Sequence, residues 1–235
     1  MASSAAHMTP QERTSSFSLA SIFALRMFGL FIILPVFAVY ARELPGGDSE
    51  TLVGITLGIY GLTQGLLQIP FGVASDRLGR KPVIIFGLII FALGSFLAAS
   101  GANIWIVMLG RMLQGAGAIS AAVTAFIADS VRVQVLTKAM AMVGASIGLT
   151  FALSLLISPP LTKLWGVSGL FTLTGISALI AVLVVKFVVP PAPQSAIDEK
   201  NEHRSWRKVV CDPQLVRLNI GIFVLHAVLT LSLIH

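Results

Sequence analysis

The chain has 235 residues, of which 56% are hydrophobic and only 11% are charged. Soluble globular proteins carry about 25% charged residues, so this composition excludes a water-soluble fold. The formal net charge of +6 does not indicate a nucleic-acid partner, because the charges lie between long apolar runs, where they act as topology signals. The single cysteine, Cys211, excludes an internal disulfide and a cysteine-rich metal site, and we expect neither a metal nor a cofactor.

The chain opens with a polar segment, residues 1–16, of which residues 1–7 resemble a cloning tag. Six long apolar runs follow, at residues 17–40, 51–74, 82–99, 104–128, 139–157 and 170–189. Each is close to or above the roughly 20 residues that a helix needs to cross a bilayer. We therefore expect an all-α integral membrane fold, with a six-helix bundle over residues 17–189.

The apolar pattern breaks after the sixth run. Residues 190–215 begin with three prolines among four residues and continue with polar residues, which predicts a linker. Residues 216–235 are apolar again, but this run stops without a polar flank. We expect an incomplete seventh helix, and hence a bundle that needs a missing C-terminal half.

Lysine and arginine are distributed unevenly between the two ends of the predicted helices. Twelve of the 16 fall on the side of the N-terminus and the linker, namely Arg13, Arg77, Arg80, Lys81, Arg132, Lys138, Lys186, Lys200, Arg204, Arg207, Lys208 and Arg217. Only Arg42 and Lys163 fall on the opposite side. Cytoplasmic loops carry the excess of positive charge, so we expect the N-terminus in the cytoplasm.

The other two arginines lie inside predicted helices. Arg26 and Arg111 are roughly 14 Å and 10 Å from the nearer helix start, at 1.5 Å per residue. An unpaired charge at such a depth costs about 2.5–3.5 kcal/mol or more, so both should face the bundle interior or a hydrated path. Bonding to backbone carbonyls of a neighbouring helix is the alternative for each.

No aspartate or glutamate occurs within the six runs. If both arginines lack acidic partners altogether, the path is electropositive and favours an anionic or carbonyl-rich solute. If a missing half supplies carboxylates to these arginines, the solute could instead be a lipophilic cation.

Three further polar residues follow one face of the second run: Tyr60, Gln64 and Gln68. Such a face is costly against lipid, so it lines a cavity or forms interhelical hydrogen bonds. Another face carries a stripe of glycines, Gly54, Gly58, Gly61 and Gly65, which permits close helix approach. In the seventh run, His226 carries an imidazole that titrates near neutral pH when unperturbed, so it is either a proton carrier or an interhelical hydrogen-bonding group.

The loop between the second and third runs places three cations and one acid within six residues. It reads Gly72-Val73-Ala74-Ser75-Asp76-Arg77-Leu78-Gly79-Arg80-Lys81. Positive-inside charge explains the cations but not Asp76 or the glycine spacing. In the fourth run, Arg111, Gln114 and Gly115 form the pattern R-x-x-Q-G.

Together these patterns resemble the two signature motifs of the major facilitator superfamily, the first being G-x-x-x-D-R-x-G-R-K. The resemblance implies twelve helices in two halves of a bacterial inner-membrane protein. The halves rock about a central cavity and exchange a small solute, with protons as the coupling ion. From the buried charges and polar faces we place a solute or proton path through Arg26, Tyr60, Gln64, Gln68, Arg111, Gln114 and His226. Residues 158–161 keep one proline of the family's antiporter pattern but lack its glycines, which leaves the direction of exchange open.

We hypothesise a gate on the cytoplasmic face, formed by the loop residues Gly72, Asp76, Arg77, Gly79, Arg80 and Lys81 together with Asp129. We expect Arg80 to pair with Asp129, and Asp76 to cap a helix of the other half. A solvated surface pair worth about 0–1 kcal/mol is the alternative.

The expected function is the N-terminal half of a secondary transporter, proton-coupled for efflux or exchange. A truncated or regulatory membrane fragment without transport activity is the alternative. We expect no enzyme, because no run contains a carboxylate pair, a Cys-His pair or a metal-ligand spacing.

Overall fold

The computed structural model describes residues 7–190, 213, 216–217, 220–221 and 224. The chain divides into two compact units, Met1–Pro193 and Gln194–His235. The described residues of the second unit are all helical. His226, predicted to be either a proton carrier or an interhelical hydrogen-bonding group, lies outside the described residues.

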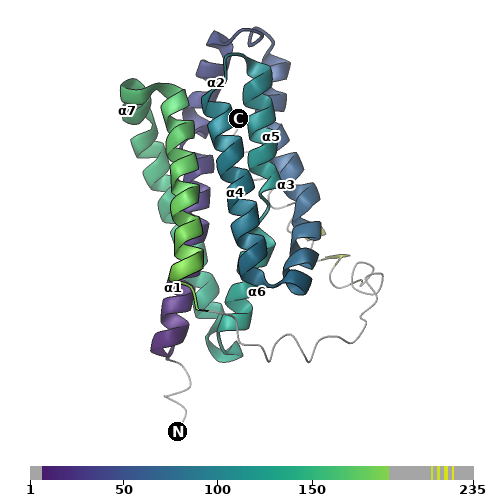
Figure 1. Cartoon of the computed structure of the whole chain (residues 1–235), viewed down its shortest axis with the longest axis vertical. Helices are drawn as coiled ribbons and strands as arrows, with labels where there is room; N and C mark the ends of the chain where they lie inside the picture. The colour runs from purple at the N-terminus through teal and green to yellow at the C-terminus, as the bar shows by residue number, and fades with distance from the viewer. Residues whose placement is uncertain (1–6, 191–212, 214–215, 218–219, 222–223, 225–235) are drawn as a thin grey trace. The chain divides into compact units, whose positions relative to one another are not determined.

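The first unit is built from helices, with no strand among its described residues. In chain order they are α1 (Pro10–Phe31), α2 (Leu34–Glu43), α3 (Glu50–Leu78), α4 (Arg80–Ala99), α5 (Ile104–Ala116), α6 (Ser120–Ser130) and α7 (Val133–Phe187), as Figure 1 shows. Five helical stretches are long and apolar enough to cross a membrane: Pro10–Glu43, Glu50–Leu78, Arg80–Ala99, Ile104–Ser130 and Val133–Phe187. The all-helical membrane architecture is thus confirmed, and the fifth and sixth predicted helices fall within one stretch.

Side-chain caps mark three of the helix starts. Thr9 forms a capping box with Glu12 at the start of α1, where Pro10 occupies the first turn. Ser49 accepts from the Leu52 N–H before α3, and Asn103 accepts from the Ile106 N–H before α5. Each cap satisfies a backbone donor that the first turn leaves without an intrahelical partner.

Helix α7 reverses direction at Gly166. This glycine has φ 65° and ψ 178°, a conformation outside the helical region that residues with a Cβ rarely adopt. Val135 and Ala139 from the start of α7 share one hydrophobic cluster with Ala181 and Val185 from its end, so the chain must fold back on itself. Figure 1 shows the ribbon of α7 turning back.

The fifth apolar run ends at residue 157, but helical structure continues beyond it as far as the break at Gly166. Pro159 and Pro160 lie inside helical structure that continues to the break at Gly166. Next to them, the Ser158 hydroxyl donates to the Ile32 carbonyl of the α1–α2 connection, and the Thr162 hydroxyl donates to the Ser158 carbonyl. Packing and side-chain hydrogen bonds of this kind allow proline within membrane helices.

Two other predicted helices are interrupted in the structure. Pro35 lies in the first turn of α2, where its missing N–H and its ring end the preceding helix α1 near Phe31. The run at 104–128 is broken between α5 and α6. At this break a Cβ on Gly117 would lie 2.4 Å from the Gly87 carbonyl oxygen, so the absence of a side chain lets the chain pass directly against α4.

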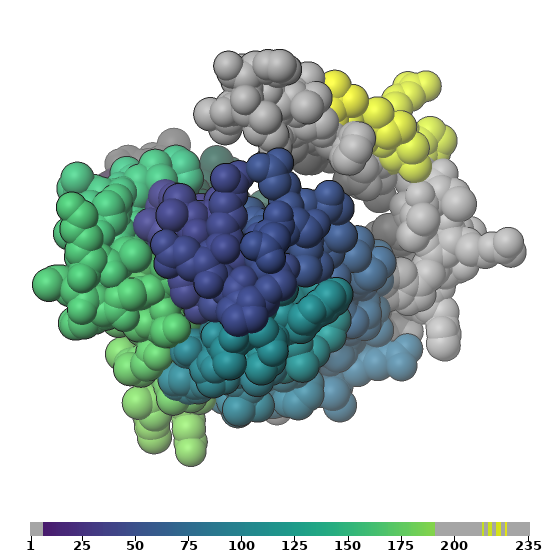
Figure 2. Space-filling model, turned by 90° about the horizontal axis from the view of Figure 1, so that it is seen from above, coloured from purple at the N-terminus to yellow at the C-terminus, as the bar shows by residue number. Residues whose placement is uncertain are grey.

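Within the described part of the chain the core comprises three hydrophobic clusters, of which the smallest joins α3, α4 and α7 through Tyr60, Phe91, Ala92 and Ala178. At one end of the bundle, the Ile104 N–H donates to the Pro45 carbonyl at 3.2 Å. Figure 2 shows the α2–α3 connection and the start of α5 side by side at this end. The smallest cluster is the one that both buried arginines adjoin.

Candidate functional site

Arg26 points into the bundle from the second half of α1 and is 1% exposed. Its Nη1 donates to the hydroxyl of Ser120, the first residue of α6, at 2.9 Å. Its guanidinium carbon lies 5.8 Å from the centroid of the Phe91 ring on α4. Its Nε and Nη2 have no hydrogen-bond partner among the described residues. One edge of this guanidinium therefore lacks an acceptor.

Arg111 heads a chain of hydrogen bonds across α5 and α4. Its Nη1 donates to Gln114 Oε1 at 3.0 Å, and Gln114 Nε2 donates to the Ser95 hydroxyl at 2.8 Å. Ser95 in turn donates to the Phe91 carbonyl at 2.8 Å. All three polar side chains are at most 1% exposed. The predicted alternative, in which arginine bonds backbone carbonyls, is not what these contacts show.

Tyr60 lies beneath the Arg111 guanidinium. The distance from the Arg111 guanidinium carbon to the ring centroid is 4.7 Å, which is cation–π geometry. The Tyr60 hydroxyl and Arg111 Nε are buried and have no hydrogen-bond partner among the described residues. An unpaired buried polar group costs roughly 1–3 kcal/mol, so such a group marks a place where a further partner would stabilise the protein.

The structure brings only part of the predicted path together. Arg26, Tyr60, Arg111 and Gln114 gather around α4. Gln64 and Gln68 are half-buried on α3, and among the described residues neither shares a hydrogen bond with Tyr60 or Arg111. Ser95 and Ser120 complete the network although sequence reasoning missed them, since a serine in an apolar run carries no distinctive pattern.

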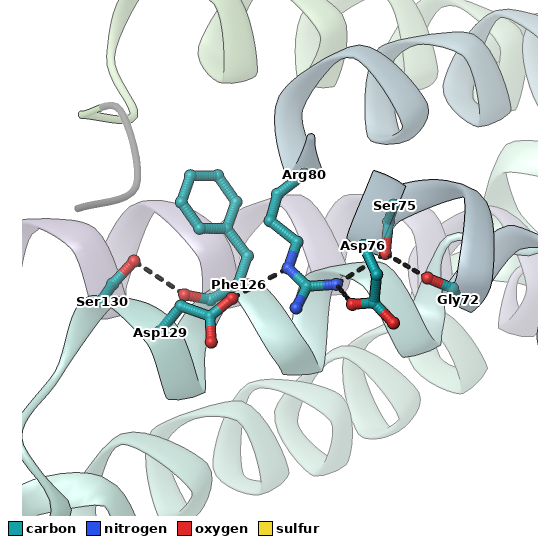
Figure 3. A network of polar contacts seen from close by, with 7 residues as sticks. All are labelled: Gly72, Ser75, Asp76, Arg80, Phe126, Asp129 and Ser130. Carbon is teal, nitrogen blue, oxygen red and sulfur yellow. Dashed lines mark hydrogen bonds and ion pairs between the residues drawn. The ribbon is translucent and has the colours of Figure 1, made fainter. Parts of the chain in front are cut away.

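The charged loop between α3 and α4 forms a second polar network (Figure 3). Arg80 Nε donates to Asp129 Oδ2 at 2.9 Å, so the predicted ion pair is present. Arg80 Nη1 contacts Asp76 and donates to the Ser75 hydroxyl at 2.8 Å. Arg80 and Asp129 are 16% and 21% exposed at their side chains, whereas Asp76 is 62% exposed. Asp76 thus contacts Arg80 while most of its carboxylate faces outward.

Gly79 shapes this loop. It has φ 93° between the end of α3 and the start of α4, a left-handed conformation that favours glycine. The tight turn places Arg80 in the first turn of α4, facing the end of α6. The neighbouring Lys81 Nζ donates to the carbonyl of Val189 beyond α7, and Arg77 is exposed.

A third network, which sequence reasoning also missed, ties the start of α1 to the α6–α7 connection. Arg132 Nε donates to Glu12 Oε1 at 2.8 Å, and Arg132 Nη2 donates to Glu12 Oε2 at 3.1 Å. The Arg132 N–H donates to the same carboxylate at 3.0 Å. The side-chain hydrogen bonds to Glu12, and then the negative charge of Glu12, raise the pKa of Arg132 above its usual value.

The glycine stripe of α3 is open. A Cβ added to Gly54, Gly58, Gly61 or Gly65 would meet no heavy atom within 4 Å. Gly144 and Gly148 in α7 are equally open. Among the described residues, these faces therefore do not pack against other helices, although small residues of this kind permit close packing.

Comparison with known proteins relates the chain to one family of membrane transporters. Residues 19–234 match the family model described as Major Facilitator Superfamily. The chain is similar to the inner membrane transport protein YajR of Escherichia coli K12, with 46% identity over 94% of this chain and 49% of that protein. It is also similar to the class B tetracycline resistance protein of Escherichia coli, with 35% identity over 53% of this chain and 32% of that protein.

Among solved structures, the human organic anion transporter MFSD10 superimposes with a TM-score of 0.67 at 19% identity. The match covers 78% of this chain and 49% of that one. At such low identity the likeness concerns the fold. The chain spans about half the length of the curated relatives that it matches over most of its own length.

Proposed function

The chain belongs to the major facilitator superfamily, and from this premise we propose that it forms the N-terminal, six-crossing half of a proton-coupled secondary transporter. In this proposal α7 counts as two crossings, because Gly166 interrupts it and its two ends share a hydrophobic cluster. The N-terminus lies in the cytoplasm of a bacterial cell, on the side with most of the lysines and arginines. The second half completes the path by which a small solute crosses the inner membrane.

The observation that carries the proposal is the buried network of Arg111, Gln114 and Ser95, with Tyr60 beneath it. A charge in the middle of a membrane bundle is costly, and such charges mark substrate or proton paths. Three separate helices, α3, α4 and α5, contribute to this network. A charge kept there with unpaired donors beside it supports a transport path better than a packing role.

Two further features support movement against a second bundle. The open glycine faces of α3 and α7 permit another helix to approach closely. The network of Arg80, Asp76 and Asp129 lies at the ends of α3, α4 and α6, where its contacts can form and break as the two halves rock. We assign the cytoplasmic gate to this network.

Reconstitution in proteoliposomes tests the function. The chain is fused at its linker to the second half of Escherichia coli YajR, and the vesicles contain a pH-sensitive dye. Three probe solutes are used: tetracycline, ethidium and benzoate. We expect a pH gradient to drive at least one of them, with matching proton movement. Arg111→Gln should slow that movement about tenfold or more, whereas the exposed Arg42→Gln should leave it unchanged.

The opposite result is equally definite. If whole YajR moves one of the three probes while the folded fusion moves neither solute nor protons, the chain is not a transport half. A non-transporting membrane fragment would then be the better description.

A further inference from the structure

The two buried guanidinium groups flank one aromatic cluster. Arg26 lies over the ring of Phe91, and Arg111 lies over the ring of Tyr60. Tyr60 and Phe91 belong to the same hydrophobic cluster. The Arg111 network also ends on the Phe91 carbonyl, through Gln114 and Ser95. Two positive charges from α1 and α5 therefore converge on one turn of α4.

No carboxylate balances these two charges within the described membrane helices. The acidic residues described in the first unit all lie at or beyond helix ends: Glu12, Glu43, Asp48, Glu50, Asp76 and Asp129. Four of them, Glu12, Glu50, Asp76 and Asp129, already pair with arginines at those ends. The interior around Phe91 is therefore electropositive, and a mobile anion would relieve the cost of the buried charges.

The unpaired atoms have the geometry of a carboxylate receptor. Nε and Nη2 of Arg26 form one edge of the planar guanidinium, and both lack a partner among the described residues. Such an edge offers two parallel N–H donors, which match the two oxygens of a carboxylate. Arg111 Nε and the Tyr60 hydroxyl add two more buried donors without acceptors.

From this geometry we infer that the transported solute is an organic anion, whose carboxylate binds the free edge of Arg26 with Arg111 and Tyr60 nearby. The rings of Tyr60 and Phe91 supply an apolar surface that suits a flat or aromatic body on that anion. The inference rests on the proposed transport function. Both arginines are 1% exposed, so the inference also requires neighbouring helices within this half to separate far enough to admit the carboxylate.

Three probe molecules that share a benzene ring distinguish the effect of the solute's charge on binding from the effect of its shape. Benzoate, benzamide and benzylammonium differ mainly in carrying a negative, a neutral and a positive group. Their binding to the purified 235-residue chain is measured by calorimetry, together with the shift in its unfolding temperature. We expect benzoate to bind at least about tenfold more tightly than either analogue and to raise the unfolding temperature.

Variants of the two arginines locate the binding site. Arg26→Gln and Arg111→Gln should each weaken benzoate binding about tenfold or more, since each removes a charged hydrogen-bond donor. Arg42→Gln, at an exposed pair with Glu50, is the matched control and should bind benzoate as the unchanged chain does. If an arginine variant fails to fold, the order of the three probes on the unchanged chain still decides the inference.

Two outcomes would overturn the inference. Benzylammonium or benzamide could bind the unchanged chain as tightly as benzoate, or benzoate binding could survive in both folded arginine variants. The transport function is judged separately with the YajR fusion. If the fusion moves ethidium with protons but ignores benzoate, the function stands and the anionic solute is wrong.

Discussion

At the scale of single residues, Ser95 decides how Arg111 is held. Its hydroxyl accepts from Gln114 Nε2, which leaves Gln114 Oε1 to accept from Arg111. A glutamine amide can present either its oxygen or its nitrogen. Ser95 fixes that choice from another helix, so it acts as a positioning residue for the buried charge.

Removing the Ser95 hydroxyl should therefore lower the free energy of unfolding more than removing the hydroxyl of an exposed serine does. Ser95→Ala leaves the buried Gln114 amide without its acceptor, and we expect a loss of about 1–3 kcal/mol of stability. Unfolding in a mixed-micelle SDS titration measures it. Ser100→Ala, at an exposed serine after α4, is the matched control and should stay within about 0.5 kcal/mol. Equal effects of the two substitutions would contradict the positioning role.

The sequence predicts how deeply the two arginines are buried, but it does not predict which residues they contact. Arg26 and Arg111 are visible because arginine is rare in apolar runs. Ser95 and Ser120 are not, because a serine in an apolar run resembles any other small helical residue. Their partners lie 19 and 94 residues away in the chain, so the contacts depend on how the helices cross.

At the scale of helices, glycines separate packed contacts from open faces. Gly117 lies between α5 and α6, where an added Cβ would be 2.4 Å from the Gly87 carbonyl oxygen of α4. Gly144 in α7 has open space around it. The two positions have the same residue type but opposite surroundings.

Alanine should tell these two glycines apart. We expect Gly117→Ala to cost about 1–3 kcal/mol, because α4 and the α5–α6 connection must separate to admit the methyl group. Gly144→Ala is the matched control and should be neutral or slightly stabilising, since alanine favours a helix. The unfolding temperatures of the two purified variants measure the difference. If both substitutions have the same effect, the close approach at Gly117 is not rigid.

A second prediction at this scale concerns the contact between α1 and the α6–α7 connection. Glu12→Gln removes the charge that Arg132 contacts through three hydrogen bonds. We expect faster amide hydrogen exchange over residues 7–16, by about tenfold. Glu50→Gln is the control, because that pair with Arg42 is largely exposed and contributes about 0–1 kcal/mol. Unchanged exchange at the start of α1 would show that the capping box alone holds it.

A helix boundary can be predicted from the sequence where charged or capping residues mark it. It cannot be predicted where packing between helices determines whether the helix continues. The starts of α4 and α5 coincide with the predicted runs to within two residues. The fifth apolar run stops before Pro159 and Pro160, yet the helix continues through them, because the neighbouring serine and threonine bond to nearby carbonyls. The turn is made instead by Gly166, which looks no different from the other glycines in the sequence.

At the scale of the whole molecule, the gate proposal predicts a shift in conformation. In the YajR fusion, Asp76→Asn weakens the contact with Arg80 and should lower the transport rate severalfold while exposing the cytoplasmic side of the path. Cysteine labelling in a Cys211→Ser background measures the exposure. Asp48→Asn, at an exposed site in the α2–α3 connection, is the control. Unchanged rate and labelling with Asp76→Asn would rule out the gate.

The proposed orientation can be tested on the same scale. With Cys211 replaced by serine, single cysteines are introduced at Asp48 and Gln134, both of which are exposed. An impermeant maleimide added outside intact spheroplasts should label Asp48→Cys and not Gln134→Cys, because positive charge favours the cytoplasm. Lysed cells, in which both sites should react, are the control. The reverse labelling would place the N-terminus outside.

The contacts at the start of α4 have a mechanical consequence. Arg80 holds Asp129 at the end of α6, and its neighbour Lys81 holds the Val189 carbonyl just past α7. Glu12 and Arg132 meanwhile fasten α1 to the turn between those two helices. A displacement of the first turn of α4 would therefore break both of these contacts together, while the Glu12–Arg132 contact still joins α1 to the α6–α7 connection.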